Sequence, residues 1–156
     1  MRLKDRVALI TGGAAGIGKA TAEKFVEEGA TVIIADINAE AGEETAGMLG
    51  EKAFFHHVNI ADRRAVQEWV DRMVEEHGRI DILINNAGVL RDATLVKVRD
   101  GELVKQMPEE DFDMVIAINL KGVFNCTQAV APVMIRQGSG VILLSLIHIS
   151  EPTRPY

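Results

Sequence analysis

The chain has 156 residues, of which 47% are hydrophobic and 26% charged, a composition typical of one ordinary folded domain. Asp and Glu number 23 against 17 Lys and Arg, and the net charge of −6 argues against a nucleic-acid partner, which would require a basic surface. The single cysteine, Cys126, excludes an internal disulfide. Apolar runs are shorter than the roughly 20 residues of a membrane helix, and the first residues lack the apolar stretch of a secretory signal. We therefore expect no membrane span and a cytoplasmic location.

Short apolar runs alternate with amphipathic segments along the chain. The predicted strands cover residues 7–10, 31–35, 53–58, 82–84 and 141–143. The predicted helices cover residues 17–28, 39–49, a segment capped by Asp62 and ended by Gly78, and 108–137. Strict alternation of strand and helix is typical of right-handed βαβ units around a parallel sheet. We therefore expect an α/β fold: a Rossmann-like, doubly wound sheet whose five strands lie in the order 3-2-1-4-5.

The turn between the first strand and the first helix consists mostly of small residues. It reads Thr11, Gly12, Gly13, Ala14, Ala15, Gly16, Ile17, Gly18. Small residues let the backbone approach a phosphate, and the N-terminus of the following helix offers free N–H groups to an anion. Asp36 follows Gly16 by about 20 positions, the context in which such a turn binds a dinucleotide. The alternative is a tight strand-to-helix turn that binds no ligand.

Asp36 and Ile37 end the second predicted strand. A carboxylate there can accept hydrogen bonds from both hydroxyls of an adenosine ribose and would repel a 2′-phosphate. Neither Ala15 nor Ile37 is a Lys or Arg that could bind such a phosphate. The pattern therefore favours NAD over NADP, and the alternative is an aspartate that caps the next helix.

A second motif, Asn85-Asn86-Ala87-Gly88, follows the fourth predicted strand. Together with the Thr-Gly-x-x-x-Gly-x-Gly turn it resembles the short-chain dehydrogenase/reductase family, over residues 1–143. The resemblance implies an NAD(P)-dependent oxidoreductase that forms a homo-oligomer, a tetramer or a dimer. It also implies contacts with the cofactor: Asn86, Ala87 and Gly88 would border it, and Asn59 and Ile60 would lie against the adenine.

The resemblance also implies a role for Asn119, which lies within Ile118–Phe124. It matches the active-site asparagine of the family, which distorts its helix and holds a water in a proton relay. An asparagine inside a helix competes for backbone hydrogen bonds, which is consistent with such a distortion. Without the surrounding pattern, Asn119 would be interpreted as a buried or dimer-facing polar residue.

Residues 91–97 and 109–112 are similar to the corresponding segments of 3-oxoacyl-acyl-carrier-protein reductases. This resemblance implies a small-molecule or carrier-bound acyl substrate and a role in fatty acid biosynthesis. Sugar and alcohol dehydrogenases of the family share parts of the same pattern. The connection of residues 89–110 is longer than is usual in such reductases. Asp100-Gly101 within it predicts a β-hairpin. The hairpin is expected to place Arg91, Lys97, Arg99 and Lys105 near the substrate, and a solvated hairpin is the alternative. His56 and His57 have no second pair at metal-ligand spacing, so we predict no metal.

The resemblance ends near Leu143. The reaction of the family uses a Ser, a Tyr and a Lys four residues after the Tyr. The Ser is expected at position 147, which is Ile147, and the only tyrosine is Tyr156, so we expect all three groups to be absent. Residues 144–156 are similar to a translated sequencing adapter. The expected organisation is an incomplete dinucleotide-binding domain, 1–143, with a non-native tail, 144–156, or alternatively a divergent native tail. A non-catalytic dinucleotide-binding module is the second functional hypothesis.

Overall fold

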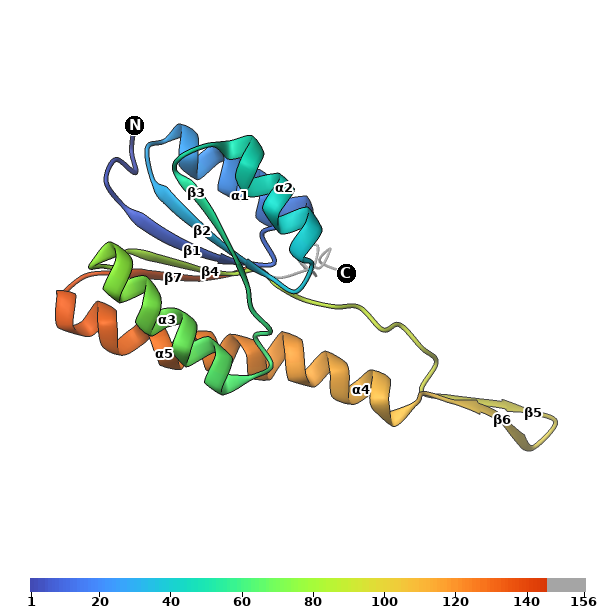
Figure 1. The fold of residues 1–156 in the computed structure, drawn as a ribbon. Coiled ribbons are helices and arrows are strands. Elements are labelled where there is room, and N and C mark those ends of the chain that lie inside the picture. Colours follow the sequence, from blue (N-terminus) through green and yellow to red (C-terminus); the bar gives the residue numbers. More distant parts are fainter. Residues whose placement is uncertain (146–156) are drawn as a thin grey trace, which may run out of the picture.

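The computed structural model describes residues 1–145, in which five parallel strands form one central sheet (Figure 1). The strands are β1 (Val7–Thr11), β2 (Thr31–Asp36), β3 (Ala53–His57), β4 (Ile82–Asn85) and β7 (Val141–Leu144). Their order is β3-β2-β1-β4-β7. The predicted fold class and strand order are therefore confirmed, with β7 as the fifth strand.

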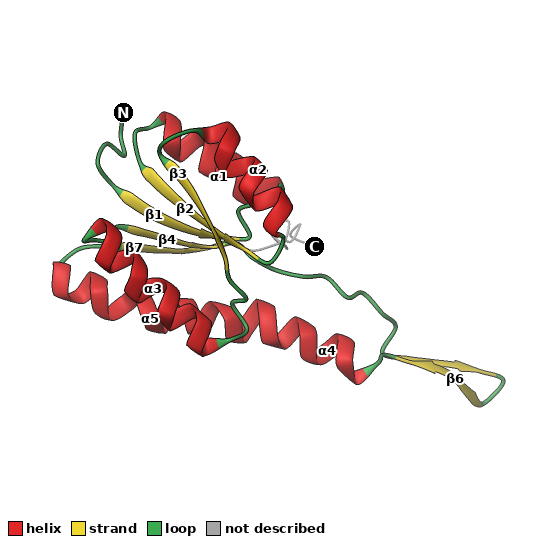
Figure 2. Ribbon diagram, viewed as in Figure 1, coloured by secondary structure: helices red, strands yellow, loops and turns green. Residues whose placement is uncertain are grey.

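Helices cover both faces of the sheet (Figure 2). On one face lie α1 (Gly16–Glu27) and α2 (Ala39–Leu49), and on the other lie α3 (Arg63–His77) and α5 (Val123–Gln137). Helix α5 continues a longer helical segment that consists of α4 (Glu109–Val115) and the π-helical η1 (Ile116–Gly122). After β3 the chain passes through α3 to β4, which pairs with β1 on the side away from β2. The strand order reverses between β1 and β4, whose carboxyl ends lie side by side, and ligands bind at such a point in doubly wound sheets.

The helix boundaries follow from capping residues. The Asn38 side chain accepts a hydrogen bond from Ala41 N at 3.1 Å, which begins α2. The Asp62 carboxylate accepts bonds from the first N–H groups of α3 in the same way, as predicted. Gly78 and Gly138 end α3 and α5 in the left-handed conformation that glycine adopts without strain.

Alternating strand residues supply two separate apolar cores. Ala8 and Ile10 of β1 pack toward α1, whereas Leu9 between them packs toward α3 and α5. Trp69 of α3 and Val130 of α5 are buried in the second core, at 3% and 0% exposure. Both faces of β1 are therefore covered, which explains why its sequence is continuously apolar.

The segment Glu109–Gln137 is a 29-residue helix that is long and apolar enough to cross a membrane by length and composition alone. Its apolar residues are interrupted by polar ones, so no continuous apolar run marks it in the sequence. One face of the helix packs against α3 through buried residues such as Cys126 and Val130, and its first turn is acidic. These are features of a core helix in a folded domain.

A two-stranded hairpin extends from the body between β4 and α4 (Figure 1). It consists of β5 (Val96–Arg99) and β6 (Glu102–Gln106), which pair antiparallel. Asp100 and Gly101 connect them with φ values of 52° and 83°, the geometry of a type I′ turn. The predicted hairpin is therefore confirmed, and every residue of its two strands is exposed.

Candidate active site

The turn after β1 contains small residues partly because neighbouring backbone atoms leave no room for side chains at some of its positions. Gly12 has a φ of 66°, and a Cβ on it would lie 2.7 Å from the Ala87 Cα. A Cβ on Gly18 would collide with the carbonyl oxygen of Gly12. Gly16 differs, because its φ is 55° and the space on its Cβ side is open. Gly12 and Gly18 therefore permit close packing, whereas Gly16 leaves an open approach to the first turn of α1.

Asn86 fastens this turn to the end of β4. Its side-chain Nδ2 donates to the carbonyl oxygens of Thr11 at 3.1 Å and Gly12 at 3.0 Å. In return, the Thr11 hydroxyl accepts from the backbone N–H groups of Asn86 and Ala87, both at 3.1 Å. These bonds satisfy buried backbone groups and hold the two motifs in one rigid arrangement.

The two motifs border a cavity of about 520 Å³, called here the first cavity. Most of the residues predicted to bind cofactor line it: Gly12, Ala15, Gly16, Ile17, Asp36, Ile37, Asn59, Ile60, Asn86, Ala87 and Gly88. Gly13, Ala14 and Gly18 do not line it. These three residues are buried behind the turn, where Gly13 packs on Ile34 and Gly18 on Gly12.

Asp36 lies at the end of β2 in the wall of the first cavity. Its Oδ2 accepts from Ala14 N at 3.2 Å and its Oδ1 from Asn38 N at 3.0 Å, so the carboxylate is held by one bond to each oxygen. Helix α2 is capped by Asn38, which makes the interpretation of Asp36 as a helix cap wrong. No Lys or Arg is among the described residues that line this cavity.

A second cavity, also of about 520 Å³, shares Ala87, Gly88 and Val89 with the first. Its remaining walls are mainly apolar side chains from the loop after β4, the segment before α4, the long helix and the end of β7: Leu90, Met107, Phe112, Val115, Leu120, Val123 and Leu144. Asn119 also lines it. The two cavities are therefore adjacent, and a ligand that extended from the first into the second would meet Asn119 and mainly apolar walls.

Asn119 joins the long helix to the segment between the two cavities. Its Nδ2 donates to the carbonyl oxygen of Val89 and its Oδ1 accepts from Val89 N, both at 2.9 Å. It lies within η1, so the helix is distorted where the resemblance implied. A sequence pattern gives no signal for Val89, whose role depends on its backbone alone.

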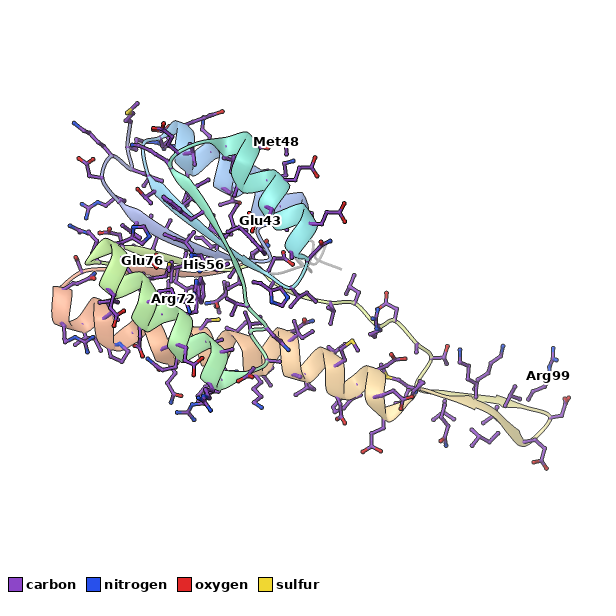
Figure 3. All side chains as sticks on the ribbon, viewed as in Figure 1. Glu43, Met48, His56, Arg72, Glu76 and Arg99 are labelled. Atoms are coloured by element: carbon purple, nitrogen blue, oxygen red, sulfur yellow. The ribbon has the colours of Figure 1, made fainter. Side chains whose placement is uncertain are left out.

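The expected cluster of cations near the substrate is wrong for three of its four members. Arg91 lines the second cavity, and its Nε lies 3.6 Å from Asp111 Oδ1. Lys97, Arg99 and Lys105 do not line the cavity. They belong to the hairpin, and Arg99 lies near the end of the hairpin away from the body (Figure 3). Every residue of the two strands is exposed and the hairpin extends away from the body (Figure 1), so the structure has the solvated hairpin that was the alternative.

Ile147 and Tyr156, where the sequence places the missing serine and the only tyrosine, lie outside the described residues. Ser145 is described, and it lines the second cavity while its N–H donates to Asn85 O at 2.9 Å. Within residues 1–145 no group of three or more His, Cys, Asp or Glu could hold a metal ion. Burial raises the pKa of the Cys126 thiol to about 12, so this thiol is an inert core group rather than a nucleophile.

The order of the five strands, the glycine turn and the position of the first cavity at the carboxyl ends of the strands define a doubly wound protein of the Rossmann type. The model of the short chain dehydrogenase family matches residues 6–146, and the chain belongs to this family, whose members are oxidoreductases that bind a nicotinamide dinucleotide.

Individual relatives agree with this assignment. The chain is 49% identical over 155 residues to the 3-oxoacyl-[acyl-carrier-protein] reductase FabG of Thermotoga maritima, covering 97% of the chain and 57% of the relative. It is 41% identical over 145 residues to tropinone reductase-like 2 of Erythroxylum coca, covering 92% of the chain and 50% of the relative. The crystal structure of NAD⁺-bound xylitol dehydrogenase superposes with a TM-score of 0.80 at 34% identity, covering 92% of the chain and 54% of that structure. The chain thus spans about half the length of these relatives.

Proposed function

We propose that this chain carries the dinucleotide-binding part of an NAD-dependent oxidoreductase that transfers a hydride between the nicotinamide and a carbonyl or alcohol. The observation that carries the proposal is the first cavity, in which the open Gly16 turn lies at one wall and the Asp36 carboxylate at another. A pyrophosphate fits beside the first turn of α1, and a ribose fits against Asp36. The domain is proposed to comprise residues 1–143.

Different residues along the two cavities would bind different parts of the dinucleotide. Gly16 and Ile17 would offer backbone N–H groups to the pyrophosphate, and Asp36 would accept hydrogen bonds from the ribose hydroxyls. Asn59 and Ile60 would contact the adenine, and Ala87 lies where the two cavities meet. The bound dinucleotide supplies or accepts the hydride.

Asn119 is proposed as the active-site asparagine. Both polar atoms of its side chain are already bonded to Val89, so the side chain fixes the wall between the cavities instead of contacting substrate. We propose that the π-helical turn around it leaves a backbone carbonyl available to hold a water next to the reacting carbonyl. Asn119 would thus act partly through its backbone.

The proposed substrate is a 3-oxoacyl thioester, either small or carried by an acyl carrier protein. The 49% identity to the reductase of Thermotoga maritima and the apolar walls of the second cavity support this class. A sugar or alcohol dehydrogenase is the second candidate, favoured by the likeness to xylitol dehydrogenase. Assay of a protein that contains this chain with acetoacetyl thioesters and with xylitol would separate the two.

A non-catalytic dinucleotide-binding module is the alternative for the chain as written, because Tyr156 is its only tyrosine. We propose that the 156-residue chain binds NADH and turns over no carbonyl. We also propose a cytoplasmic homo-oligomer, dimeric or tetrameric, for the whole protein. Membrane and nucleic-acid partners are not proposed, given the net charge of −6 and the packing of the long helix on α3.

The test is a fluorescence titration of the 156-residue chain with NADH and NADPH. We expect NADH to bind more tightly, by about ten-fold or more, because the 2′-phosphate of NADPH would face the Asp36 carboxylate. Replacement Asp36→Ser should narrow this difference, whereas the control Asp71→Ser, an exposed residue of α3, should leave it unchanged. Equal affinity of the unmodified chain for both dinucleotides would contradict the assignment of Asp36.

A further inference from the structure

The loop after β3 forms one wall of the first cavity through Asn59 and Ile60. The loop is short, and Asn59 is exposed. Within the loop, Asn59 Oδ1 accepts from Ala61 N at 3.0 Å, and Asn59 O accepts from Asp62 N at 3.1 Å. These local bonds shape the turn, and the bond from Val58 N to Asp36 O at 3.1 Å ties the start of the loop to the end of β2. Beyond Val58, the position of the turn depends on contacts with other elements.

The long helix supplies such contacts from two positions that lie about one turn apart, Gly122 and Asn125. Asn125 of α5 is 2% exposed, and its Nδ2 donates to Ile60 O at 2.9 Å and to Ala61 O at 3.4 Å. One turn earlier, Gly122 approaches the Ile60 side chain so closely that a Cβ would lie 2.5 Å from Ile60 Cδ1. Ile60 is thus held by its carbonyl oxygen on one side and its side chain on the other.

We infer that Asn125 is a positioning residue that sets the place of the Asn59–Ile60 wall, and thereby the affinity for the adenosine half of the dinucleotide. The inference deepens the proposed function and rests on it, because it assigns this wall to the adenosine. Asn125 does not line either cavity, so it acts only through Ile60 and Ala61. Burial of an amide N–H group costs free energy unless the group donates a hydrogen bond. The bonds from Asn125 to the two loop carbonyls are therefore favoured, and they tie the loop to α5.

The same helix offers a matched comparison at its other end. Gln137 of α5 donates through Nε2 to Ile80 O at 2.8 Å and accepts through Oε1 from Ile80 N at 2.9 Å. These bonds join the end of α5 to the segment that enters β4, at the amino end of the strand, whereas the cavities lie at the carboxyl ends. Loss of either amide should weaken the fold, but only Asn125 is connected to the ligand wall.

The test compares Asn125→Asp with Gln137→Glu in the 156-residue chain. Each replacement keeps the size of the side chain and removes its N–H donors. ADP-ribose and nicotinamide mononucleotide serve as probes for the two halves of the dinucleotide, titrated separately by calorimetry. We expect Asn125→Asp to weaken ADP-ribose binding by about ten-fold, because the ligand must then order a wall that Asn125 no longer holds, and to change nicotinamide mononucleotide binding less than two-fold. Gln137→Glu should leave both affinities within two-fold.

A ligand-free measurement keeps the inference separate from the proposed function. Hydrogen exchange should be faster at the backbone amides of Ala61 and Asp62 in Asn125→Asp and unchanged there in Gln137→Glu. If Asn125→Asp unfolds, Asn125→Leu, which removes the amide without adding a charge, is measured in the same way. If hydrogen exchange is faster in Asn125→Asp but the unmodified chain does not bind ADP-ribose, the inference that this wall binds adenosine is overturned, and the result also counts against the proposed function. An equal loss of both ligands, or an unchanged ADP-ribose affinity in a folded variant, would overturn the inference alone.

Discussion

At the scale of single residues, Asp81, which immediately precedes β4, shows how one buried carboxylate joins separate parts of the chain. Its Oδ1 accepts from Arg6 Nη1 at 2.8 Å, and its Oδ2 accepts from Val7 N at 2.9 Å and from Arg79 Nε at 2.8 Å. Burial raises the pKa of this carboxyl group, but the hydrogen bonds from Arg79, Val7 and Arg6 outweigh burial and lower the pKa below the ordinary value of 3.8.

A lowered pKa in the folded state makes stability depend on pH. The stabilisation by Asp81 is complete above the unfolded-state pKa and disappears as pH falls through the lower, folded-state pKa. We expect Asp81→Asn to lower the free energy of unfolding at pH 7 by about 1–3 kcal/mol and to weaken its dependence on pH below 3.8, measured by urea unfolding. The exposed Asp71→Asn should change it little. An unchanged urea midpoint for Asp81→Asn at pH 7 would refute this prediction.

At the scale of elements, two helical glycines predict opposite effects of the same substitution. Gly122 is packed against Ile60, so Gly122→Ala should force the side chain of Ile60 to move and should destabilise the fold by about 1–3 kcal/mol. Gly47 of α2 has no atom within 4 Å of its Cβ position, so Gly47→Ala should stabilise the helix by up to about 1 kcal/mol. Thermal unfolding of the two variants gives the comparison, and a shift of both in the same direction would contradict it.

The hairpin formed by β5 and β6 is an element without a role in the core. Its strand residues are exposed, and the bond from Met107 N to Leu95 O at 3.0 Å holds the two ends together at its base. Replacement of residues 96–106 by a short Gly-Asn-Gly connection should therefore change the free energy of unfolding by only about 0.5 kcal/mol, the size of an ordinary surface change. NADH affinity should also stay the same. A fall of several degrees in the melting temperature would show that the hairpin packs on the body.

At the scale of the whole molecule, apolar side chains remain exposed on one side. Phe124 and Ile135 of α5 are 53% and 78% exposed, and Leu143 of the sheet-edge strand β7 is 51% exposed. Exposed apolar patches and open strand edges promote association between chains. We expect the 156-residue chain to associate in a concentration-dependent way in sedimentation velocity, and Phe124→Lys with Leu143→Lys to reduce it. The control Asp71→Lys, which changes the charge at another exposed position, should not reduce the association. A monodisperse monomer of the unmodified chain at about 100 µM would refute this expectation.

The sequence predicted most of the framework because the relevant signals are local. Buried strands are continuously apolar, and caps such as Asp62 and Gly78 mark the ends of α3. The spacing of Gly16 and Asp36 placed both residues in the wall of one cavity. The cations of the hairpin were misplaced because an Asp-Gly turn indicates that a hairpin forms but not in which direction it extends.

By itself, the sequence determined the alternation of strands and helices, the glycine turn, and the family, because these depend on residue type and spacing along the chain. Only the tertiary structure decided which backbone groups the polar side chains hold. Asn119 bonds Val89, and Asn125 bonds Ile60, across 30 and 65 positions of the chain. Such pairs depend on how the long helix packs against the loops at the carboxyl ends of the strands, and no local pattern records that packing.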